Sequence, residues 1–235
     1  MLILAFETSA KSVSAALVQD GALLGEYYQN SGQTHSRTLM KLAQDLLANC
    51  DLQPGDVTHV AYANGPGSFT GIRIGAAAAK GFCWGAELPC VPVSTLLGMA
   101  RFHTELSGVL CPCMDARRSQ VYNALFRCEN GRLTRLCPDR ALSLEELSRD
   151  LAQLDEPIYL LGDGALLTWQ TLAQRHNLIL LPEHLRHQRA AGVALAGYDA
   201  VLRGETADPA LSVPNYLRLS QAERERLAKE KEKGE

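Results

Sequence analysis

The chain repeats one pattern of apolar segments and turns. In each half a short apolar run ends at an acidic residue, Glu7 or Asp115, and a polar turn then leads into a hairpin closed by Asp20-Gly21 or Asn130-Gly131. Asp-Gly and Asn-Gly between apolar runs are strong signals of a β-hairpin. An internal repeat of this kind predicts two halves with one fold, and it constrains the architecture more than any single motif.

The spacing of apolar residues predicts the elements of each half. In the first half we expect strands at residues 2–6, 13–18, 23–28, 57–63 and 90–93, with helices at 35–50, 71–85 and 94–105. In the second half we expect strands at 109–114, 121–128, 132–136, 157–161 and 178–181, with helices at 144–154, 165–175 and 190–202.

The order βββαβαβα in both halves predicts a duplicated α/β fold of the actin-like (ASKHA), ribonuclease-H type, with a cleft between the halves. We divide the chain into an N-terminal half with partner-binding helices at 1–106, a C-terminal half at 107–204, and an extended C-terminal segment with a charged tail at 205–235. The tail balances five acidic against five basic residues from Glu223 onward. This composition predicts a solvated, frayed helix, with a partner-docking helix as the alternative.

The charge balance limits the ways in which this chain can meet nucleic acid. It contains 23 Lys and Arg against 26 Asp and Glu, for a net charge of -3. A protein that binds nucleic acid alone usually carries a basic surface that replaces the phosphate counterions. We therefore expect any contact with nucleic acid to go through another protein.

Three features indicate a cytoplasmic protein. The N-terminal sequence MLILAFETS has no basic leader, and the chain has no run of about 18 apolar residues that would span a membrane. The seven cysteines include no CxxC pair. That usage is typical of free thiols in a reducing compartment.

The segment NGPGSFTGIRIG at residues 64–75 is rich in glycine and precedes a helix. Gly65 and Gly67 can adopt backbone angles that other residues avoid, and Ser68 or Thr70 can cap the helix. The free N–H groups of the helix N-terminus, with the charge of Arg73, predict a nucleotide or anion contact. Alternatively, the glycines let the helix cross closely over a strand.

The helix after this loop, GIRIGAAAAKGFCWG, has almost no polar face. Such a helix must be covered on both sides, and we expect the sheet on one side and either the second half or a second chain on the other. With the helix at 35–50 it is expected to form half of an intermolecular four-helix bundle. The predicted partner interface comprises Leu39, Leu42, Leu46, Ile72, Ala76, Ala79 and Phe82.

The candidate catalytic features are incomplete. An actin-like phosphotransferase holds phosphates on two glycine-containing turns, which here read Glu7-Thr8-Ser9 and Asp115-Ala116-Arg117. Side chains crowd the approach of an anion to backbone N–H groups, so the sequence disfavours a kinase or ATPase. Ser9, Ser68 and Ser94 are candidate nucleophiles, but none stands in a GxSxG elbow.

Five segments resemble one known family. ILAFETS, HSRTLMKLAQDLL, AYANGPGSFTGIRIGAAAAKG, ELPCVPVSTL and MDARRSQVY are similar to the bacterial tRNA threonylcarbamoyladenosine biosynthesis family TsaB, also called YeaZ. GPGSFTGIRIG is the most specific of these motifs. The matching motifs end at Tyr122, and the second half resembles the family in plan more than in letters.

The resemblance implies a subunit of a tRNA modification system. The family acts with its paralogue TsaD and the ATPase TsaE to place a threonylcarbamoyl group on the adenosine 3′ of the anticodon. TsaD does the chemistry, and its metal-binding histidines correspond here to Thr95 and Met99, which are poor ligands for the cations that imidazole holds. The resemblance therefore implies no catalytic role, no metal site and no cofactor bound by this chain alone.

The resemblance also implies partners. These are TsaD, through the two apolar helices, TsaE, and tRNA only through the complex, with a homodimer when the chain is alone and ATP or ADP at the surface shared with TsaD. The first hypothesis is accordingly a scaffold that binds and activates TsaD. The alternatives are a protease acting on TsaD and a sugar-kinase-like phosphotransferase, which the glycine-free turns disfavour.

Overall fold

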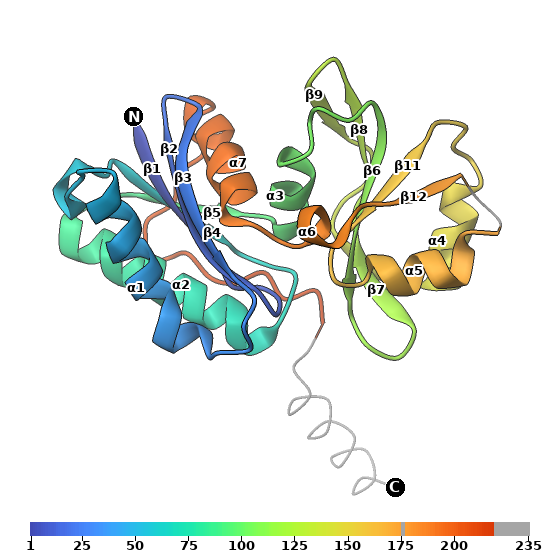
Figure 1. Cartoon of the computed structure of the whole chain (residues 1–235), viewed down its shortest axis with the longest axis horizontal. Coiled ribbons are helices and arrows are strands. Elements are labelled where there is room, and N and C mark those ends of the chain that lie inside the picture. The colour runs from blue at the N-terminus through green and yellow to red at the C-terminus, as the bar shows by residue number, and fades with distance from the viewer. Residues whose placement is uncertain (175–176, 219–235) are drawn as a thin grey trace, which may run out of the picture.

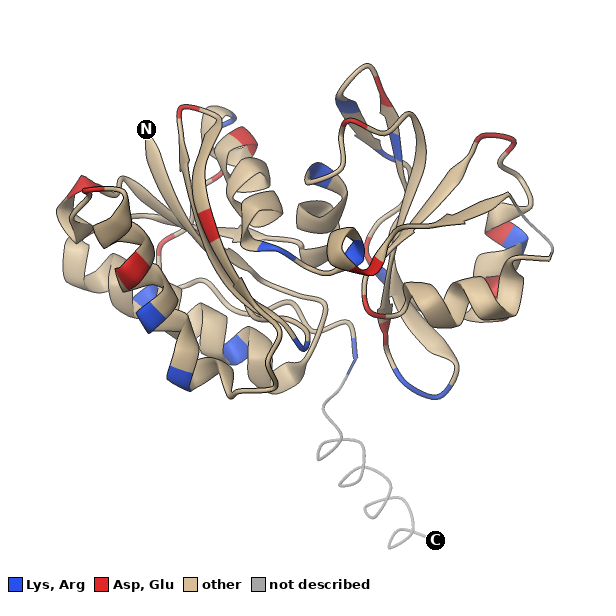
Figure 2. Ribbon diagram, in the orientation of Figure 1, with Lys and Arg blue, Asp and Glu red and all other residues tan. Residues whose placement is uncertain are grey.

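Each of the two lobes is built on a mixed β-sheet (Figure 1). The structure, a computed structural model, describes residues 1–174 and 177–218. The expected end of the helix at 165–175 and the charged tail after Arg218 lie outside the described residues. Figure 2 shows basic and acidic residues interspersed over both lobes in that view, in keeping with the net charge of -3.

The first sheet follows the order β3-β2-β1-β4-β5. Its strands are β1 (Leu2–Glu7), β2 (Val13–Gln19), β3 (Ala22–Gln29), β4 (His59–Ala63) and β5 (Cys90–Val93). β1 pairs antiparallel with β2 and parallel with β4. This is the expected ribonuclease-H-type sheet. The helices of this half are α1 (His35–Asn49), α2 (Phe69–Ala86) and α3 (Thr95–Arg101), and a short 3-10 helix, η1 (Pro54–Asp56), precedes β4.

Alternation along β1 divides the first lobe into two cores. Leu4 and Phe6 face the core that contains α1 and α2, whereas Ile3 and Ala5 face the opposite core. Successive strand side chains point to opposite faces of a sheet, so a fully apolar strand indicates cover on both faces. α1 and α2 lie together on one face of the first sheet (Figure 1).

The second sheet follows the order β10-β7-β6-β11-β12; β8 also pairs with β6, and β9 pairs with β8. Its strands are β6 (Gly108–Asp115), β7 (Gln120–Asn123), β8 (Phe126–Glu129), β9 (Arg132–Arg135), β10 (Arg140–Ser143), β11 (Ile158–Leu161) and β12 (Leu178–Leu180). The helices are α4 (Leu144–Leu151), α5 (Ala165–Leu172), α6 (Glu183–Arg186) and α7 (Ala190–Leu202). The sequence predicted neither β10 nor α6, and α3 is shorter than the expected helix at 94–105.

The single strand expected at 121–128 is observed as two strands, β7 and β8, so the prediction of one continuous strand is wrong. Both pair with β6, on either side of Pro112. Proline has no backbone N–H to donate to a ladder, so pairing cannot continue at that position. The Nδ2 of Asn123 instead donates to the Pro112 carbonyl at 3.0 Å.

Helix α7 packs against the first lobe, although it ends the range expected for the second half. It contacts β1, β2, β4, β5 and α3. A Cβ on Gly192 would lie 2.1 Å from the Gly98 carbonyl oxygen, so the missing side chain allows α3 and α7 to cross closely. α7 is apolar on almost every side and is covered by both the sheet and α3. Helix α7 was expected in the C-terminal half at 107–204, but it packs as part of the first lobe.

Residues 205–218 run in extended form along the first lobe, as expected for the C-terminal segment. Ala207 forms a bridge with Cys90, and the hydroxyls of Tyr62 and Ser212 are hydrogen-bonded. The Asn215 N–H donates to the Asn64 carbonyl at 2.8 Å. In the described ranges, no helix is both long and apolar enough to cross a bilayer.

Candidate functional site

The turns that follow β1 and β6 each contain the same kind of hydrogen bond, from a backbone N–H to the acidic side chain two residues earlier. The Glu7 carboxylate accepts the Ser9 N–H at 2.6 Å, and the Asp115 carboxylate accepts the Arg117 N–H at 2.7 Å. A phosphate held at either turn would need such backbone donors. In both lobes this N–H donor is already bonded to the chain's own carboxylate.

The first turn is held under α2 by two glycines. A Cβ on Gly71 would lie 2.1 Å from the Thr8 carbonyl oxygen, and one on Gly75 would lie 2.4 Å from the Thr8 Oγ1. The Thr8 hydroxyl also donates to the Gly71 carbonyl at 2.7 Å. These glycines therefore allow the close crossing that the sequence offered as the alternative to an anion site.

The two glycines around Pro66 also serve packing. Gly65 has a φ of +109°, and a Cβ there would lie 2.4 Å from the Asn215 carbonyl oxygen. A Cβ on Gly67 would lie 2.5 Å from the Ser9 carbonyl oxygen. Gly65 thus seats the C-terminal segment, and Gly67 seats the first turn.

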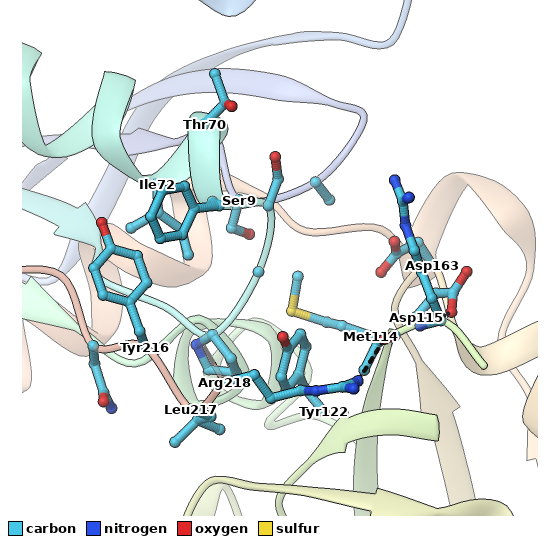
Figure 3. A pocket seen from close by; sticks show the side chains of 18 of the residues that line it. Ser9, Thr70, Ile72, Met114, Asp115, Tyr122, Asp163, Tyr216, Leu217 and Arg218 are labelled. Atoms are coloured by element: carbon cyan, nitrogen blue, oxygen red, sulfur yellow. Dashed lines mark hydrogen bonds between the residues drawn. The ribbon is translucent and has the colours of Figure 1, made fainter. Parts of the chain in front are cut away.

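A cleft of about 560 Å³ lies between the lobes (Figure 3). Ser9 and Thr70 on one side face Asp115 and Asp163 on the other, and Tyr216 and Arg218 close one edge. The Arg218 guanidinium donates to the Ala116 carbonyl at 2.8 Å. The cleft thus combines residues of both lobes with the C-terminal segment.

Of the predicted nucleotide or anion contacts, Gly67, Ser68 and Thr70 line the cleft, whereas Gly65 and Arg73 are not among its lining residues. The guanidinium of Arg73 stacks 3.8 Å from the Phe69 ring centroid, and its Nε donates to the Tyr216 hydroxyl at 2.9 Å. Aromatic rings therefore hold the Arg73 charge outside the cleft, and its nucleotide or anion contact stays a prediction.

Two acidic side chains near the cleft are shielded from solvent: Glu7 is buried and Asp163, which lines the cleft, is half-buried. Burial raises the pKa of Glu7 to about 7, against the opposing effect of hydrogen bonds from Ser9. Burial also raises the pKa of Asp163, whose Oδ1 accepts the Gln188 Nε2 at 2.9 Å. The buried hydroxyl of Ser9 has no hydrogen-bond partner. The floor of the cleft therefore holds poorly solvated oxygen atoms.

Asp163 was not singled out from the sequence. It stands in the triplet Gly162-Asp163-Gly164, directly after β11. Gly162 has a φ of +95°, and a Cβ there would lie 2.3 Å from the Cys113 carbonyl oxygen. The sequence signal that could have identified Asp163 is a Gly-Asp-Gly triplet at the end of an apolar strand.

Two of the three candidate serine nucleophiles have structural partners, whereas the Ser9 hydroxyl has none. The Ser68 hydroxyl accepts the Gly71 N–H as the cap of α2, and the Ser94 hydroxyl donates to Asp139. Within residues 1–174 and 177–218, none of Ser9, Ser68 and Ser94 is hydrogen-bonded to a histidine. A serine hydrolase needs such a base. The protease alternative is therefore unsupported.

Comparison with known proteins identifies the family. A family model described as TsaD, tRNA N6-adenosine threonylcarbamoyltransferase, matches residues 28–226. The tRNA threonylcarbamoyladenosine biosynthesis protein TsaB of Bacillus subtilis (strain 168) is 34% identical over 227 residues, which are 95% of this chain and 96% of that protein. The chain belongs to the TsaD family and, within it, to the TsaB proteins.

Two further TsaB relatives agree. TsaB of Escherichia coli (strain K12) is 31% identical over 93% of this chain and 95% of its own length. The solved structure of YeaZ from Pseudomonas aeruginosa has a TM-score of 0.79 and 25% identity, over 92% of this chain and 99% of that one. The expected family and the expected actin-like α/β fold are both confirmed.

The positions that the resemblance equates with the TsaD metal ligands are buried in this TsaB chain. Thr95 is fully buried and its hydroxyl has no hydrogen-bond partner, while the Met99 methyl packs against Gly162. A hydroxyl and a thioether are weak ligands for the cations that imidazole holds. In the described part of the chain, no group of three or more His, Cys, Asp and Glu side chains could hold a metal ion.

Most of the side chains predicted for the TsaB partner interface are buried within the single chain. The following predicted residues are at most 4% exposed within the single chain: Leu39, Leu46, Ile72, Ala76 and Ala79. Leu42 and Phe82 are half-buried at the edge of the same core. The stripe detected by helical spacing is the one that faces the chain's own interior. Much of the second cover of α2 is the C-terminal segment, which Arg73 and Lys80 hold through Tyr216 and Ser212.

Proposed function

We propose that this TsaB-family chain acts in the biosynthesis of threonylcarbamoyladenosine in tRNA as a noncatalytic subunit. It binds TsaD, keeps that enzyme in its active arrangement, and recruits TsaE. It meets tRNA only as part of the complex, and it works in the cytoplasm. When alone it associates with a second copy.

One observation carries this proposal. In both lobes, an N–H group of the turn that would hold a phosphate is bonded to the chain's own acidic side chain. Thr95 and Met99 add to it, since neither supplies an imidazole where the resemblance places the TsaD ligands. A chain of this family that lacks those ligands, and in which each turn already bonds one of its N–H donors to its own carboxylate, is better suited to supporting catalysis than to performing it.

The proposal also assigns a place to the nucleotide. ATP or ADP would be held at the surface shared with TsaD and would not be held by this chain alone. Calorimetry of the lone chain with ATP and Mg²⁺ should then give no binding isotherm, whereas the mixture with TsaD should give one. Tight binding of ATP to the lone chain would favour the phosphotransferase alternative.

Reconstitution tests the central claim. Purified TsaD and TsaE of the same organism, threonylcarbamoyl-adenylate and unmodified tRNA are incubated with and without this chain, and modified adenosine is quantified by mass spectrometry of nucleosides. We expect modification only when the chain is present, and none from the chain alone. Full modification in its absence would falsify the proposal.

A further inference from the structure

Four basic side chains without carboxylate partners stand at the mouth of the interlobe cleft. Lys11 follows β1, Arg117 follows β6 and Arg218 belongs to the C-terminal segment, and all three line the cleft. Arg118 is the next residue and is exposed. Within residues 1–174 and 177–218, none of the four forms an ion pair with an acidic side chain.

Other arginines of the second lobe are neutralised by neighbouring carboxylates. The pairs are Arg127 with Glu156 at 2.7 Å, Arg135 with Asp139 at 2.6 Å, and Arg140 with Asp150 at 2.6 Å. A paired charge contributes little to the field at a distance, whereas an unpaired one attracts an anionic ligand. The mouth of the cleft therefore differs from the rest of this lobe in the charge that it offers.

The carboxylates at the same opening do not cancel its basic residues. Asp115 and Asp163 line the cleft, so the four cations face two acidic side chains there. The Asp163 carboxylate accepts the Gln188 Nε2 at 2.9 Å, and burial raises the pKa of Asp163, which weakens its negative charge. The opening thus stays positive although the whole chain carries a net charge of -3.

The basic residues are held on separate parts of the chain that meet at this opening. Figure 2 shows basic residues on both lobes beside the space between them and on the C-terminal segment. The half-buried Arg218 donates from its guanidinium to the Ala116 carbonyl at 2.8 Å, so it connects the C-terminal segment with the second lobe. Lys11 and Arg117 are exposed and can reach a ligand in solvent.

Unused hydrogen-bond donors lie beside these charges. Phe69 and Thr70 begin the 18-residue helix α2 and line the cleft, and in the described residues their backbone N–H groups have no acceptor. The Ser9 hydroxyl, which also lines the cleft, is 1% exposed and has no partner. Phosphate oxygens accept hydrogen bonds from helix N-termini and hydroxyls. The opening therefore offers both the charge and the donors that a phosphate group needs.

We infer that the mouth of the interlobe cleft binds the phosphate backbone of tRNA. Lys11, Arg117 and Arg118 contact phosphates outside the opening, and the start of α2 receives one at its edge. The inference rests on the proposed function, in which the chain acts on tRNA within a complex. The relatives carry tRNA in their names, and backbone phosphates are bound through lysine, arginine and helix N-termini whatever the base sequence. Four cations hold RNA weakly, so the lone chain should not retain tRNA.

Binding of labelled, unmodified tRNA to the assembled complex of this chain with TsaD and TsaE of the same organism tests the surface. Fluorescence anisotropy is measured between about 0.05 and 0.2 M salt. Lys11→Gln and Arg117→Gln should each raise Kd by about eightfold at 0.1 M salt and lower the salt slope by about 0.9, the counterion release of one phosphate contact. An unrelated tRNA should show the same losses, because phosphate contacts carry no sequence information.

The matched control is Arg132→Gln. Arg132 is exposed on β9, away from the cleft, and forms no ion pair in the described part of the chain, so its substitution removes the same charge elsewhere. It should leave Kd for tRNA within about twofold and the salt slope unchanged. Calorimetry should give the same affinity for TsaD with the wild-type chain and all three variants.

The outcomes separate this inference from the proposed function. If the complexes with Lys11→Gln and Arg117→Gln bind tRNA as tightly as the wild-type complex and with the same salt slope, the inference is wrong and the proposed function stands. Loss of TsaD affinity in these variants would mean that the surface meets protein, which also overturns the inference. If the lone chain binds inorganic phosphate through Lys11 and Arg117 and the complexes bind tRNA equally well, the occupant is a small anion and the inference is wrong. Full modification of tRNA without the wild-type chain would overturn the proposed function itself.

Discussion

The turn after β1 and the turn after β6 make the same local hydrogen bond in opposite surroundings. Glu7 is 1% exposed beneath α2, whereas Asp115 is exposed at the mouth of the cleft. In the first lobe Gly71 and Gly75 bring the helix directly onto the turn. In the second lobe Gly164, the residue before α5, approaches only the end of β6. The repeat therefore fixed the local bond, and helix packing fixed how deeply each turn is buried.

The backbone conformations of the two turns also differ. Arg117, Arg118 and Ser119 are all left-handed, with φ values of 63°, 56° and 57°. The residues at 8–12 in the first lobe all have negative φ. Left-handed backbone costs a residue with a side chain roughly 1 kcal/mol or more. The second turn is thus the more strained of the two, and it carries Arg117 at the cleft.

Gly71→Ala should produce the largest effect on this comparison. The new Cβ would meet the Thr8 carbonyl at 2.1 Å, and backbone cannot move aside as a flexible side chain can. We expect a loss of about 3 kcal/mol in the free energy of unfolding, measured by urea titration. Gly81→Ala on the same helix, where nothing lies within 4 Å, is the control and should gain about 0.5 to 1 kcal/mol. Equal midpoints for the two variants would show that the first turn is not held by this crossing.

Glu7→Gln should change the pH dependence of stability. The folded pKa of about 7 exceeds the ordinary value of 4.5, so the folded state holds this proton more tightly. The Glu7 contribution is therefore fully present below pH 4.5 and falls by about 3 kcal/mol as pH rises through about 7. The variant should lose the Glu7 part of this decline and retain the part of the same sign that comes from Asp163, whose pKa is also raised by burial.

The measurement is the urea unfolding free energy between pH 4.5 and 8, followed by circular dichroism. A Glu7→Gln curve with the wild-type slope would mean that the Glu7 carboxyl is not desolvated in the folded protein.

Arg118→Gly should give the smallest effect, a gain. Glycine adopts the left-handed region at little steric cost, so relief of strain outweighs the added freedom of the unfolded chain by about 0.5 to 1 kcal/mol. Ala10→Gly at the corresponding position of the first turn should lose a similar amount, because Ala10 does not have a positive φ. Thermal unfolding of both variants checks the opposite signs. Two losses would show that the turns are strained alike.

Much of the fold could be predicted from local patterns, and the failures have identifiable causes. Helix α7 occupies the predicted residues, because apolar residues continue without a polar break. Its place on the first lobe could not be predicted, since helical spacing shows that a face is buried and not which sheet covers it. The break at Pro112 was readable in principle, because proline cannot join the ladder between β6 and a continuous partner strand.

The candidate site divides in the same way. Gly67, Ser68 and Thr70 were predicted near an anion and do line the cleft, because the loop after β4 lies at the edge where the lobes meet. Arg73 was predicted to contact the anion only because it is close to the loop in sequence. One helical turn beyond the loop, its side chain points to Phe69 and Tyr216 instead. No pattern within α2 could predict that Arg73 contacts Tyr216, which is 143 residues away.

The sequence by itself determined the duplicated plan, the order of strands and helices along the chain, and the glycine-rich loop before α2. Only the tertiary structure decided what packs where a glycine has no side chain: Asn215 at Gly65, Thr8 at Gly71, and Gly98 at Gly192. It also decided that Glu7 is buried and that residues 83–89 and 206–210 form one groove. The physical reason is that periodicity of 2 or 3.6 residues records burial along one element. The residues that bury that element come from a distant part of the chain.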